Sequence, residues 1–221
     1  DQQIYLVVDD SEGKSELARS PYSAAIPKRT KRIVRFDLGA NEIAWEAESD
    51  WIAPMTLCAD ESRLYYFDGE TVVAQEKTSG DELWISDSMK TMTTLPVYLA
   101  PKLLVHDGIV MFVGSENYDN AGGSRGDLTA VSAESGETLW TARHPACGYK
   151  SPEDLFIIDE RAWSGDIMAH RWFENEFDST SEMLGVDIRD GSEQVSFTPD
   201  VDAYWFHHRC HPGRATENYI I

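Results

Sequence analysis

The fold of this chain is decided by a stretch at residues 130–140, which reads Ala-Val-Ser-Ala-Glu-Ser-Gly-Glu-Thr-Leu-Trp. Three related stretches occur at residues 35–45, 74–84 and 185–195. A residue that tolerates a left-handed backbone stands four positions before the end of each copy. These residues are Asn41, Gly80, Gly136 and Gly191, and the copies end in Trp45, Trp84, Trp140 and Val195. The pattern predicts four tight β-hairpins whose tryptophans pack between neighbouring sheets.

Further strands are predicted between these hairpins, from alternating or continuous apolar residues bounded by turn residues. They span Ile4–Val8, Arg63–Phe67, Thr71–Ala74, Leu103–His106, Ile109–Val113, Leu155–Ile158 and Arg161–Trp163. Sustained helical periodicity is absent from the sequence. The copies begin at residues 35, 74, 130 and 185, so their spacings are 39, 56 and 55 residues. A four-stranded propeller blade takes roughly 40–50 residues, and inserted loops explain the two longer spacings.

We therefore expect an all-β fold, a single partial β-propeller domain of four-stranded antiparallel blades over residues 1–221. The blades are expected at about residues 1–50, 51–95, 96–145 and 146–200, with a fifth beginning at 201. The sequence begins and ends in strand-like segments, which indicates a piece of a longer chain.

Two polar insertions, Gly114–Asp127 and Ala169–Glu182, are expected as loops on one face of the propeller. Residues 116–127 are rich in potential oxygen ligands but lack the spacing of an EF-hand, so we interpret them as a solvated loop. Loops that gather on one face of a rigid scaffold are typical of binding surfaces. We expect a protein or small-molecule partner there.

The composition excludes several classes of protein. Apolar residues make up 42% of the chain, which is enough for a packed core. There are 19 Lys and Arg against 39 Asp and Glu, a net charge of −20, so nucleic acid and anionic lipid surfaces are not expected as partners. The apolar runs are far shorter than the roughly 20 residues of a membrane-spanning helix. The sequence predicts an acidic globular protein with no membrane span.

The repeat resembles that of a known superfamily. The pattern Ala-x-(Asp/Glu)-x-x-(Thr/Ser)-Gly-x-x-x-Trp is similar to the repeat of β-propellers of the pyrroloquinoline quinone (PQQ) type. Residues 74–84 fit it, and residues 130–140 fit it except for Ser132 at the acidic position. That superfamily includes quinoprotein alcohol dehydrogenases and a propeller lipoprotein of outer-membrane protein assembly. The resemblance implies a bacterial protein exported to the periplasm or cell envelope.

A narrower resemblance covers more of the chain. Residues 57–84, 151–156, 162–165 and 207–216 are similar to large bacterial proteins, common in planctomycete-type genomes, that are described as PQQ-binding-like β-propeller repeat proteins. This group implies the fold but carries no activity over to the chain. No catalytic or cofactor-binding residue is therefore assigned from it.

The quinoprotein dehydrogenases imply a specific cofactor site. There, PQQ lies on a tryptophan and under a disulfide between adjacent cysteines, next to Ca²⁺ held by Glu, Asn and Asp. The cysteines of this chain stand at positions 58, 147 and 210, so no two are adjacent. We therefore interpret the chain as a noncatalytic binding or scaffolding module. The alternative is a quinoprotein-like oxidoreductase that uses PQQ and Ca²⁺, with its site partly outside this chain.

The weak candidates for metal ligands are His207, His208, Cys210 and His211. Imidazole and thiolate groups bind Zn²⁺ and copper. Successive side chains on a strand point to opposite faces, however, so one metal would not easily collect all four. We interpret the segment as a structural strand that opens a new blade.

The cysteines leave two alternatives open. A disulfide between Cys147 and Cys210 requires their Cα atoms to lie about 4.4–6.8 Å apart, which the sequence does not settle. Free buried thiols are the other reading. Cys58 lies in an apolar, strand-like context and is expected to be a free buried thiol.

Overall fold

The computed structural model of the chain describes residues 3–9, 28–91, 101–114, 117–119, 123–147, 154–165, 169–170, 182–198, 204–205 and 213–220. The regular secondary structure in these ranges consists of β-strands. Within these ranges no helix is long and apolar enough to cross a membrane.

Four antiparallel sheets follow one another along the chain, and we number them as blades 1 to 4. Blade 1 contains, in the described residues, β1 (Gln3–Val8), β2 (Lys31–Asp37) and β3 (Glu42–Ser49). Blade 2 contains β4 (Cys58–Ala59), β5 (Arg63–Phe67), β6 (Val72–Glu76) and β7 (Glu82–Ile85). Blade 3 is built on β8 (Lys102–His106), β9 (Ile109–Val113), β11 (Gly123–Ser132) and β12 (Thr138–Cys147). Blade 4 contains β13 (Leu155–Ile158), β14 (Arg161–Gly165), β16 (Met183–Asp187) and β17 (Glu193–Phe197).

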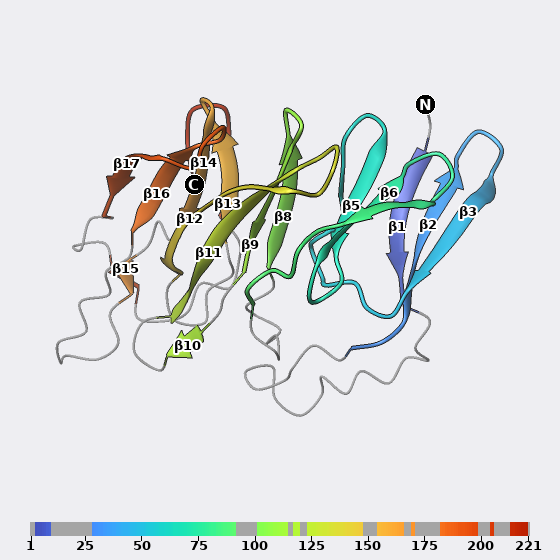
Figure 1. The fold of residues 1–221 in the computed structure, drawn as a ribbon, viewed down its shortest axis with the longest axis horizontal. Helices are drawn as coiled ribbons and strands as arrows, with labels where there is room; N and C mark the ends of the chain where they lie inside the picture. Colours follow the sequence, from blue (N-terminus) through green and yellow to red (C-terminus); the bar gives the residue numbers. More distant parts are fainter. Residues whose placement is uncertain are drawn as a thin grey trace.

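The blades stand side by side in chain order, from blade 1 at the right of Figure 1 to blade 4 at the left. Each strand pairs with the next one of its blade, so every blade is an antiparallel meander. The expected all-β fold, a partial β-propeller, is confirmed. In blade 1 the described strands β1, β2 and β3 correspond to the second, third and fourth strands of the other blades.

Short strands also occur in the segments expected as loops. β10 (Asn117–Asp119) pairs with Gly123–Arg125 of β11, so part of residues 116–127 extends the sheet of blade 3. The interpretation of this stretch as a solvated loop is therefore wrong for those residues, because β11 continues beyond the end of β9 and offers a free edge. β15 (Ala169–His170) pairs in parallel with β18 (Tyr204–Trp205).

The third and fourth strands of each blade are joined by the same turn. Its left-handed residue has a φ of 57° at Asn41, 82° at Gly80, 77° at Gly136 and 72° at Gly191. The three glycines donate their N–H groups to carbonyls four residues earlier, at 2.8–2.9 Å. The register of the two strands shifts by one residue beside the turn in all four blades. The bulge adds twist to the hairpin, which turns the fourth strand toward the next blade.

The strand registers place equivalent side chains in one row across each blade. From the second to the fourth strand, the rows are Tyr5, Arg35 and Trp45; Tyr65, Ala74 and Trp84; Met111, Ala130 and Trp140; and Trp163, Gly185 and Val195. Side chains alternate along a strand, so the row shares one face of its blade. We call it the forward face, because it packs against the next blade, and the opposite side the rear face.

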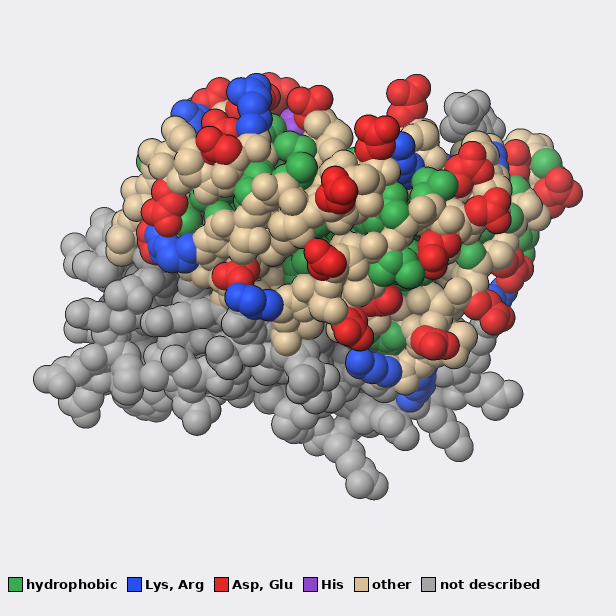
Figure 2. Space-filling view, in the orientation of Figure 1, with side chains coloured by type: hydrophobic (Ala, Val, Ile, Leu, Met, Phe, Trp, Pro, Cys, Tyr) green, Lys and Arg blue, Asp and Glu red, His purple; other side chains and the backbone are tan. Residues whose placement is uncertain are grey.

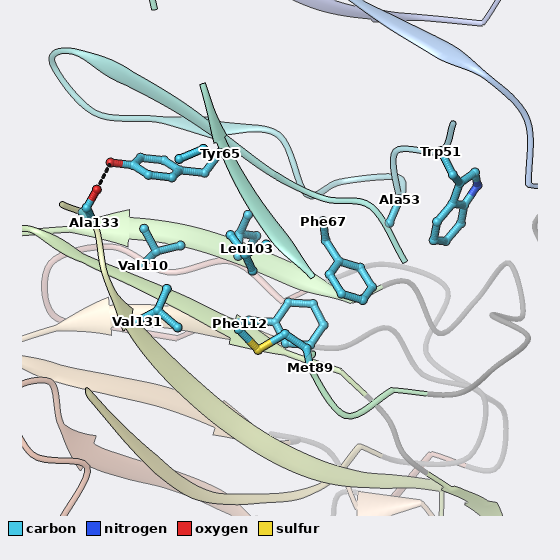
Figure 3. Packing of buried hydrophobic residues seen from close by; sticks show 12 residues of the cluster. Trp51, Ala53, Tyr65, Phe67, Met89, Leu103, Val110, Phe112, Val131 and Ala133 are labelled. Carbon is cyan, nitrogen blue, oxygen red and sulfur yellow. Dashed lines mark hydrogen bonds between the residues drawn. The ribbon is translucent and has the colours of Figure 1, made fainter. Parts of the chain in front are cut away.

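The core lies between the blades. Tyr65 and Phe67 on the forward face of blade 2 meet Val110 and Phe112 on the rear face of blade 3, as Figure 3 shows. The rings of Phe67 and Phe112 have their centroids 4.5 Å apart. Two further buried clusters join blade 1 to blade 2 and blade 3 to blade 4. Burial of apolar surface between blades is thus the main stabilising contribution.

Candidate functional site

The tryptophan of one blade packs on the turn glycine of the next. The pairs are Trp45 with Gly80, Trp84 with Gly136, and Trp140 with Gly191. A Cβ atom on these glycines would lie 2.7, 2.5 and 2.6 Å from the nearest ring atom, which is closer than real Cβ contacts. Two requirements therefore select glycine at these positions: the positive φ of the backbone and the close approach of the indole ring.

The same tryptophans hydrogen-bond to the next blade. Their indole N–H groups donate to the carbonyls of Lys77 at 3.3 Å, Ala133 at 3.1 Å and Ile188 at 2.9 Å. In two interfaces a tyrosine of the same row adds a donor, since Tyr5 reaches the Lys77 carbonyl at 3.2 Å and Tyr65 the Ala133 carbonyl at 3.3 Å. The row therefore holds blades together.

The single hydroxyl proton of Tyr65 lies between two acceptors, the Ala133 carbonyl at 3.3 Å and the Oδ2 atom of Asp60 at 2.6 Å, and the shorter bond to Asp60 is the stronger one. Burial raises the pKa of Tyr65, and the hydrogen bond to Asp60 raises it further. Burial alone would raise the pKa of Asp60, but the hydrogen bonds from Tyr65 and from backbone N–H groups outweigh it and hold that pKa below its ordinary value. The carboxylate therefore stays charged and fixes the turn between β4 and β5.

Blade 4 departs from this scheme. Val195 stands at the tryptophan position, and the aromatic side chain of the row comes from Trp163 on the second strand. A Cβ atom on Gly185 would lie 3.1 Å from both Trp163 and Val195, so the ring covers this glycine of its own blade. The indole N–H of Trp163 donates to the Ile158 carbonyl in blade 4 at 3.3 Å. The ring contact and the hydrogen bond of Trp163 thus both lie within blade 4.

The described tryptophans do not fit a quinone site. Trp51 packs on Gly69 and is 3% exposed, and each of the four other rings with a described side chain likewise lies against a glycine. A ring held in this way does not offer a free floor to a planar cofactor. Among the described residues, no group of three or more His, Cys, Asp and Glu side chains is placed to hold a metal ion. No two cysteines of the chain are adjacent, so it has no disulfide of the kind that covers PQQ in the dehydrogenases.

The blades differ most at one edge, which we call the lower edge, where the second strand is connected to the third. This connection comprises residues 9–30 in blade 1, 68–71 in blade 2, 114–122 in blade 3 and 166–182 in blade 4. Gly165 has a φ of 116°, and its Cβ atom would lie 2.0 Å from the Glu182 carbonyl oxygen. The two ends of the blade 4 connection are thus held together by a close backbone contact that requires glycine. We take the lower edge of blades 3 and 4 as the candidate functional site.

Three polar side chains are buried where blades 3 and 4 approach this edge. His144, Asp154 and Ser164 are 2%, 1% and 1% exposed. Ser164 occupies the register position of Tyr66 and Phe112 in blades 2 and 3, so blade 4 has a small polar group in place of a large ring. The Oδ1 atom of Asp154 accepts the N–H of Gly213 at 2.9 Å, which fastens the segment after blade 4 to the start of β13.

Arg143 links blades 3 and 4 beside these residues. Its guanidinium binds both carboxylate oxygens of Glu182, at 2.6 and 3.0 Å, and Glu193 at 3.1 Å. The hydrogen bonds from Arg143 hold the pKa of Glu182 below its ordinary value. They also raise the pKa of Arg143, so the guanidinium keeps its charge. The cluster is half exposed, which limits its contribution to stability.

The Arg143 cluster predicts a pH dependence. Since the folded-state pKa of Glu182 is lowered, the pair stabilises the protein above the ordinary pKa of glutamate and loses this effect as the pH falls through the folded-state value. We expect Glu182→Gln to lower the free energy of unfolding at pH 7 by about 0.5–1 kcal/mol, and by less at pH 3. Urea unfolding at both pH values measures the difference. Glu134→Gln, an exposed change away from the cluster, serves as the control, and an equal effect of Glu182→Gln at both pH values would contradict the prediction.

Cys58 is the free cysteine of the described residues. Burial raises the pKa of its thiol to about 12, and the nearby Asp60 carboxylate acts in the same direction. Since the thiolate is the reactive form, we expect Cys58 to be inert toward Ellman's reagent at pH 8 until the protein unfolds. The Cys147→Ser/Cys210→Ser variant isolates this thiol, and rapid reaction in the native state would disprove the prediction.

The remaining candidates from the sequence lie outside the described residues. These are the metal candidates His207, His208, Cys210 and His211. The side chain of Cys147 is likewise not described, so its pairing with Cys210 stays a prediction. Sequence reasoning missed Trp163, Asp154 and Arg143. The position of Trp163 in the row follows from strand register, which no local motif encodes.

Acidic side chains are spread over the described part of the face in Figure 2, with apolar side chains between them. Basic side chains are scattered among them, and several are paired with acids, as Lys90 is with Asp127 at 2.8 Å. The negative charge is thus a property of the surface around the blades, and it does not gather as a ligand set in the described residues.

A scan of protein-family models and a search of curated proteins each find no match to the chain. Solved structures do match it. The quinohemoprotein alcohol dehydrogenase of Comamonas testosteroni aligns with a TM-score of 0.55 and 15% identity, over 82% of this chain and 34% of that one. A europium-containing methanol dehydrogenase aligns with a TM-score of 0.51 and 13% identity, over 76% and 38%. BamB of Moraxella catarrhalis aligns at 0.47 and 11%, over 79% and 47%.

These likenesses concern the fold. The two dehydrogenases share the fold of this chain. The chain spans about a third to a half of the length of the solved proteins that it matches. Identities of 11–15% say nothing about which residues act in this chain.

Proposed function

We propose that this chain is a noncatalytic binding or scaffolding module whose partner, a protein or a small molecule, binds at the lower edge of blades 3 and 4. The observation that carries the proposal is the unequal connection between the second and third strands, four residues at 68–71 but much longer at 114–122 and 166–182. Long connections grafted on one edge of a repetitive scaffold are typical of binding surfaces.

The use of the recurring residues supports this reading. The tryptophans, the turn glycines and the row tyrosines are taken up by contacts between blades or within a blade. The partner surface must therefore be made by the segments that differ from blade to blade. The close contact of Gly165 with the Glu182 carbonyl and the bridge from Arg143 to Glu182 fix both ends of the blade 4 segment to the scaffold.

The test compares two matched variants of the full-length protein. One replaces residues 167–181 by the short turn sequence of blade 2, and the control replaces Asp107 by Asn in the β8–β9 turn at the opposite edge. Proteins and metabolites captured from cell-envelope extract with wild-type protein are identified, purified and titrated by calorimetry. We expect the shortened variant to melt normally and lose binding, while the control binds as wild type. Binding that survives this shortening unchanged would disprove the proposal.

The second candidate is a quinoprotein-like oxidoreductase that uses PQQ and Ca²⁺. It is favoured by the two dehydrogenases among the solved structures of the same fold. Against it stand the tryptophans packed on glycine and the separated cysteines of this chain. Titration of full-length protein with PQQ and Ca²⁺ distinguishes the two: one equivalent of bound quinone would establish the oxidoreductase, and no spectral change supports the module.

The proposal places the module in the periplasm or cell envelope, in keeping with the resemblance of its repeat. Fractionation of cells that express the full-length gene tests this location.

We also propose that residues 1–221 form one domain. Limited proteolysis tests the single domain, since a cut that releases separately folded halves would contradict it.

A further inference from the structure

The outer edge of blade 2 presents a strand that has a neighbour on one side only in the described residues. This strand is β7, the last of its sheet, which pairs with β6. The N–H of Ser86 donates to the Val72 carbonyl of β6 at 2.9 Å, and alternate residues of an antiparallel strand face the same neighbour. The N–H and C=O of Ile85 therefore face away from the sheet, where an added strand can pair with them. Blade 2 has a blade on each side, so this edge is not a face that a further blade would cover.

The side chains of β7 also differ from those of the other outer strands. Leu83 and Ile85 flank Trp84, so they lie on the rear face of blade 2, and they are 47% and 51% exposed. Among the four blades, only blade 2 has large apolar side chains at both of these positions. The equivalent pairs are Ala44 and Glu46 in blade 1, Leu139 and Thr141 in blade 3, and Gln194 and Ser196 in blade 4. Exposed apolar side chains on an edge strand favour pairing with another chain.

Acidic side chains stand at both ends of the apolar pair. Glu82 precedes Leu83, and Asp87 follows Ile85 by two residues. Both acids are exposed, and neither has a basic partner among the described residues. Pairing of β7 with β7 of a second copy would set acid against acid, which is unfavourable. The edge is instead complementary to an extended segment with apolar side chains in its middle and Lys or Arg at its ends, which the net charge of −20 also attracts.

We propose that β7 binds an extended cationic segment of a partner protein, which adds to blade 2 as a further strand. The backbone of the segment pairs with the outward N–H and C=O of Ile85. Two apolar side chains of the segment pack on Leu83 and Ile85, and Lys or Arg side chains beyond them pair with Glu82 and Asp87. This contact lies on blade 2, away from the lower edge of blades 3 and 4, so it stands or falls separately from the proposed function.

The first experiment titrates the full-length protein with a fluorescent peptide, Lys-Thr-Val-Thr-Val-Thr-Lys, and follows the anisotropy. We expect saturable binding that weakens as salt is added, because the paired charges are exposed. A peptide with Glu in place of both Lys should bind about tenfold more weakly. Of two peptides methylated at alternate amide nitrogens, one should lose more affinity, since only one set of N–H groups faces β7. No binding of the parent peptide at its solubility limit, or equal binding of the two methylated peptides, would overturn the proposal.

Matched variants test whether the peptide binds at β7. Leu83→Thr/Ile85→Thr removes the apolar pair and introduces the residue that blade 3 carries as Thr141, so the fold should tolerate it, which thermal melting verifies. The double variant should bind the peptide about tenfold more weakly or worse. Leu139→Thr, at a comparably exposed position of β12, is the control and should bind as wild type. Unchanged binding by the double variant would mean that β7 is not the site.

Hydrogen exchange of the wild-type protein gives a readout that does not depend on any variant. The Ile85 amide faces away from β6 and should exchange about tenfold more slowly when the peptide is bound, because it then donates to the added strand. The Ser86 amide already donates to Val72 and should exchange slowly in both states, which makes it the internal control. If saturating peptide leaves the exchange of Ile85 unchanged, the peptide does not add as a strand to β7 and the proposal is wrong.

Discussion

Replacing Trp140 with alanine is expected to lower the free energy of unfolding by about 3–5 kcal/mol, the usual cost of removing a large buried aromatic side chain. Trp140 is 8% exposed and fills the space between blades 3 and 4. Its removal leaves a cavity over Gly191 and takes away the hydrogen bond to the Ile188 carbonyl. Denaturant unfolding followed by circular dichroism gives the value.

The neighbouring Leu139 provides the control for Trp140. It is 48% exposed on the same strand, so Leu139→Ala should change the stability by about 0.5 kcal/mol or less. Trp140→Phe keeps a ring in the interface and should cost less than Trp140→Ala. A loss below about 1 kcal/mol for Trp140→Ala would show that the ring is not part of the interface.

Replacing Gly136 with alanine is expected to destabilise the protein by about 2–4 kcal/mol, the sum of a left-handed backbone and an overpacked contact. The new Cβ atom would lie 2.5 Å from Cε3 of Trp84, which is itself fastened to the Ala133 carbonyl. The ring cannot move without giving up this bond. The measurement is again the free energy of unfolding.

Gly108 is a matched control for Gly136. The two have almost the same φ, 76° and 77°, but a Cβ atom on Gly108 would meet nothing within 4 Å. Gly108→Ala should therefore cost about 1 kcal/mol, from backbone strain alone. Equal losses at both positions would mean that the Trp84 ring does not require the glycine.

Gly108 and Gly136 also show which features of this fold can be predicted from the sequence and which cannot. Both glycines follow short polar residues between apolar runs, and both are recognisable as turn residues from their neighbours alone. Only Gly136 lies under a tryptophan, and that tryptophan comes from the preceding blade. No property of residues 130–140 distinguishes the two roles, because the ring belongs to a remote part of the chain.

The candidate site was less accessible to sequence reasoning than the fold. The two long insertions were evident as interruptions of the repeat, and their strand-to-strand ends lie at one edge as expected from the meander of each blade. The bridge from Arg143 to Glu182 and Glu193 was not evident from the sequence, since an exposed arginine on a strand has many potential partners. The hydrogen bond from Gly213 to Asp154 joins residues that no motif connects.

The sequence by itself determined the features that contiguous residues decide. These are the hairpins, their left-handed turn residues, the alternation of faces and the succession of four blades. These follow from backbone conformation and from the two-residue period of a strand, which act over a few positions. The tertiary structure alone decided which glycine each tryptophan covers, and that in blade 4 the tryptophan of the row is Trp163 on the second strand instead of a residue on the fourth. The reason is that these contacts depend on strand register and on the distance between blades, and both are set only when apolar faces far apart in the chain pack together.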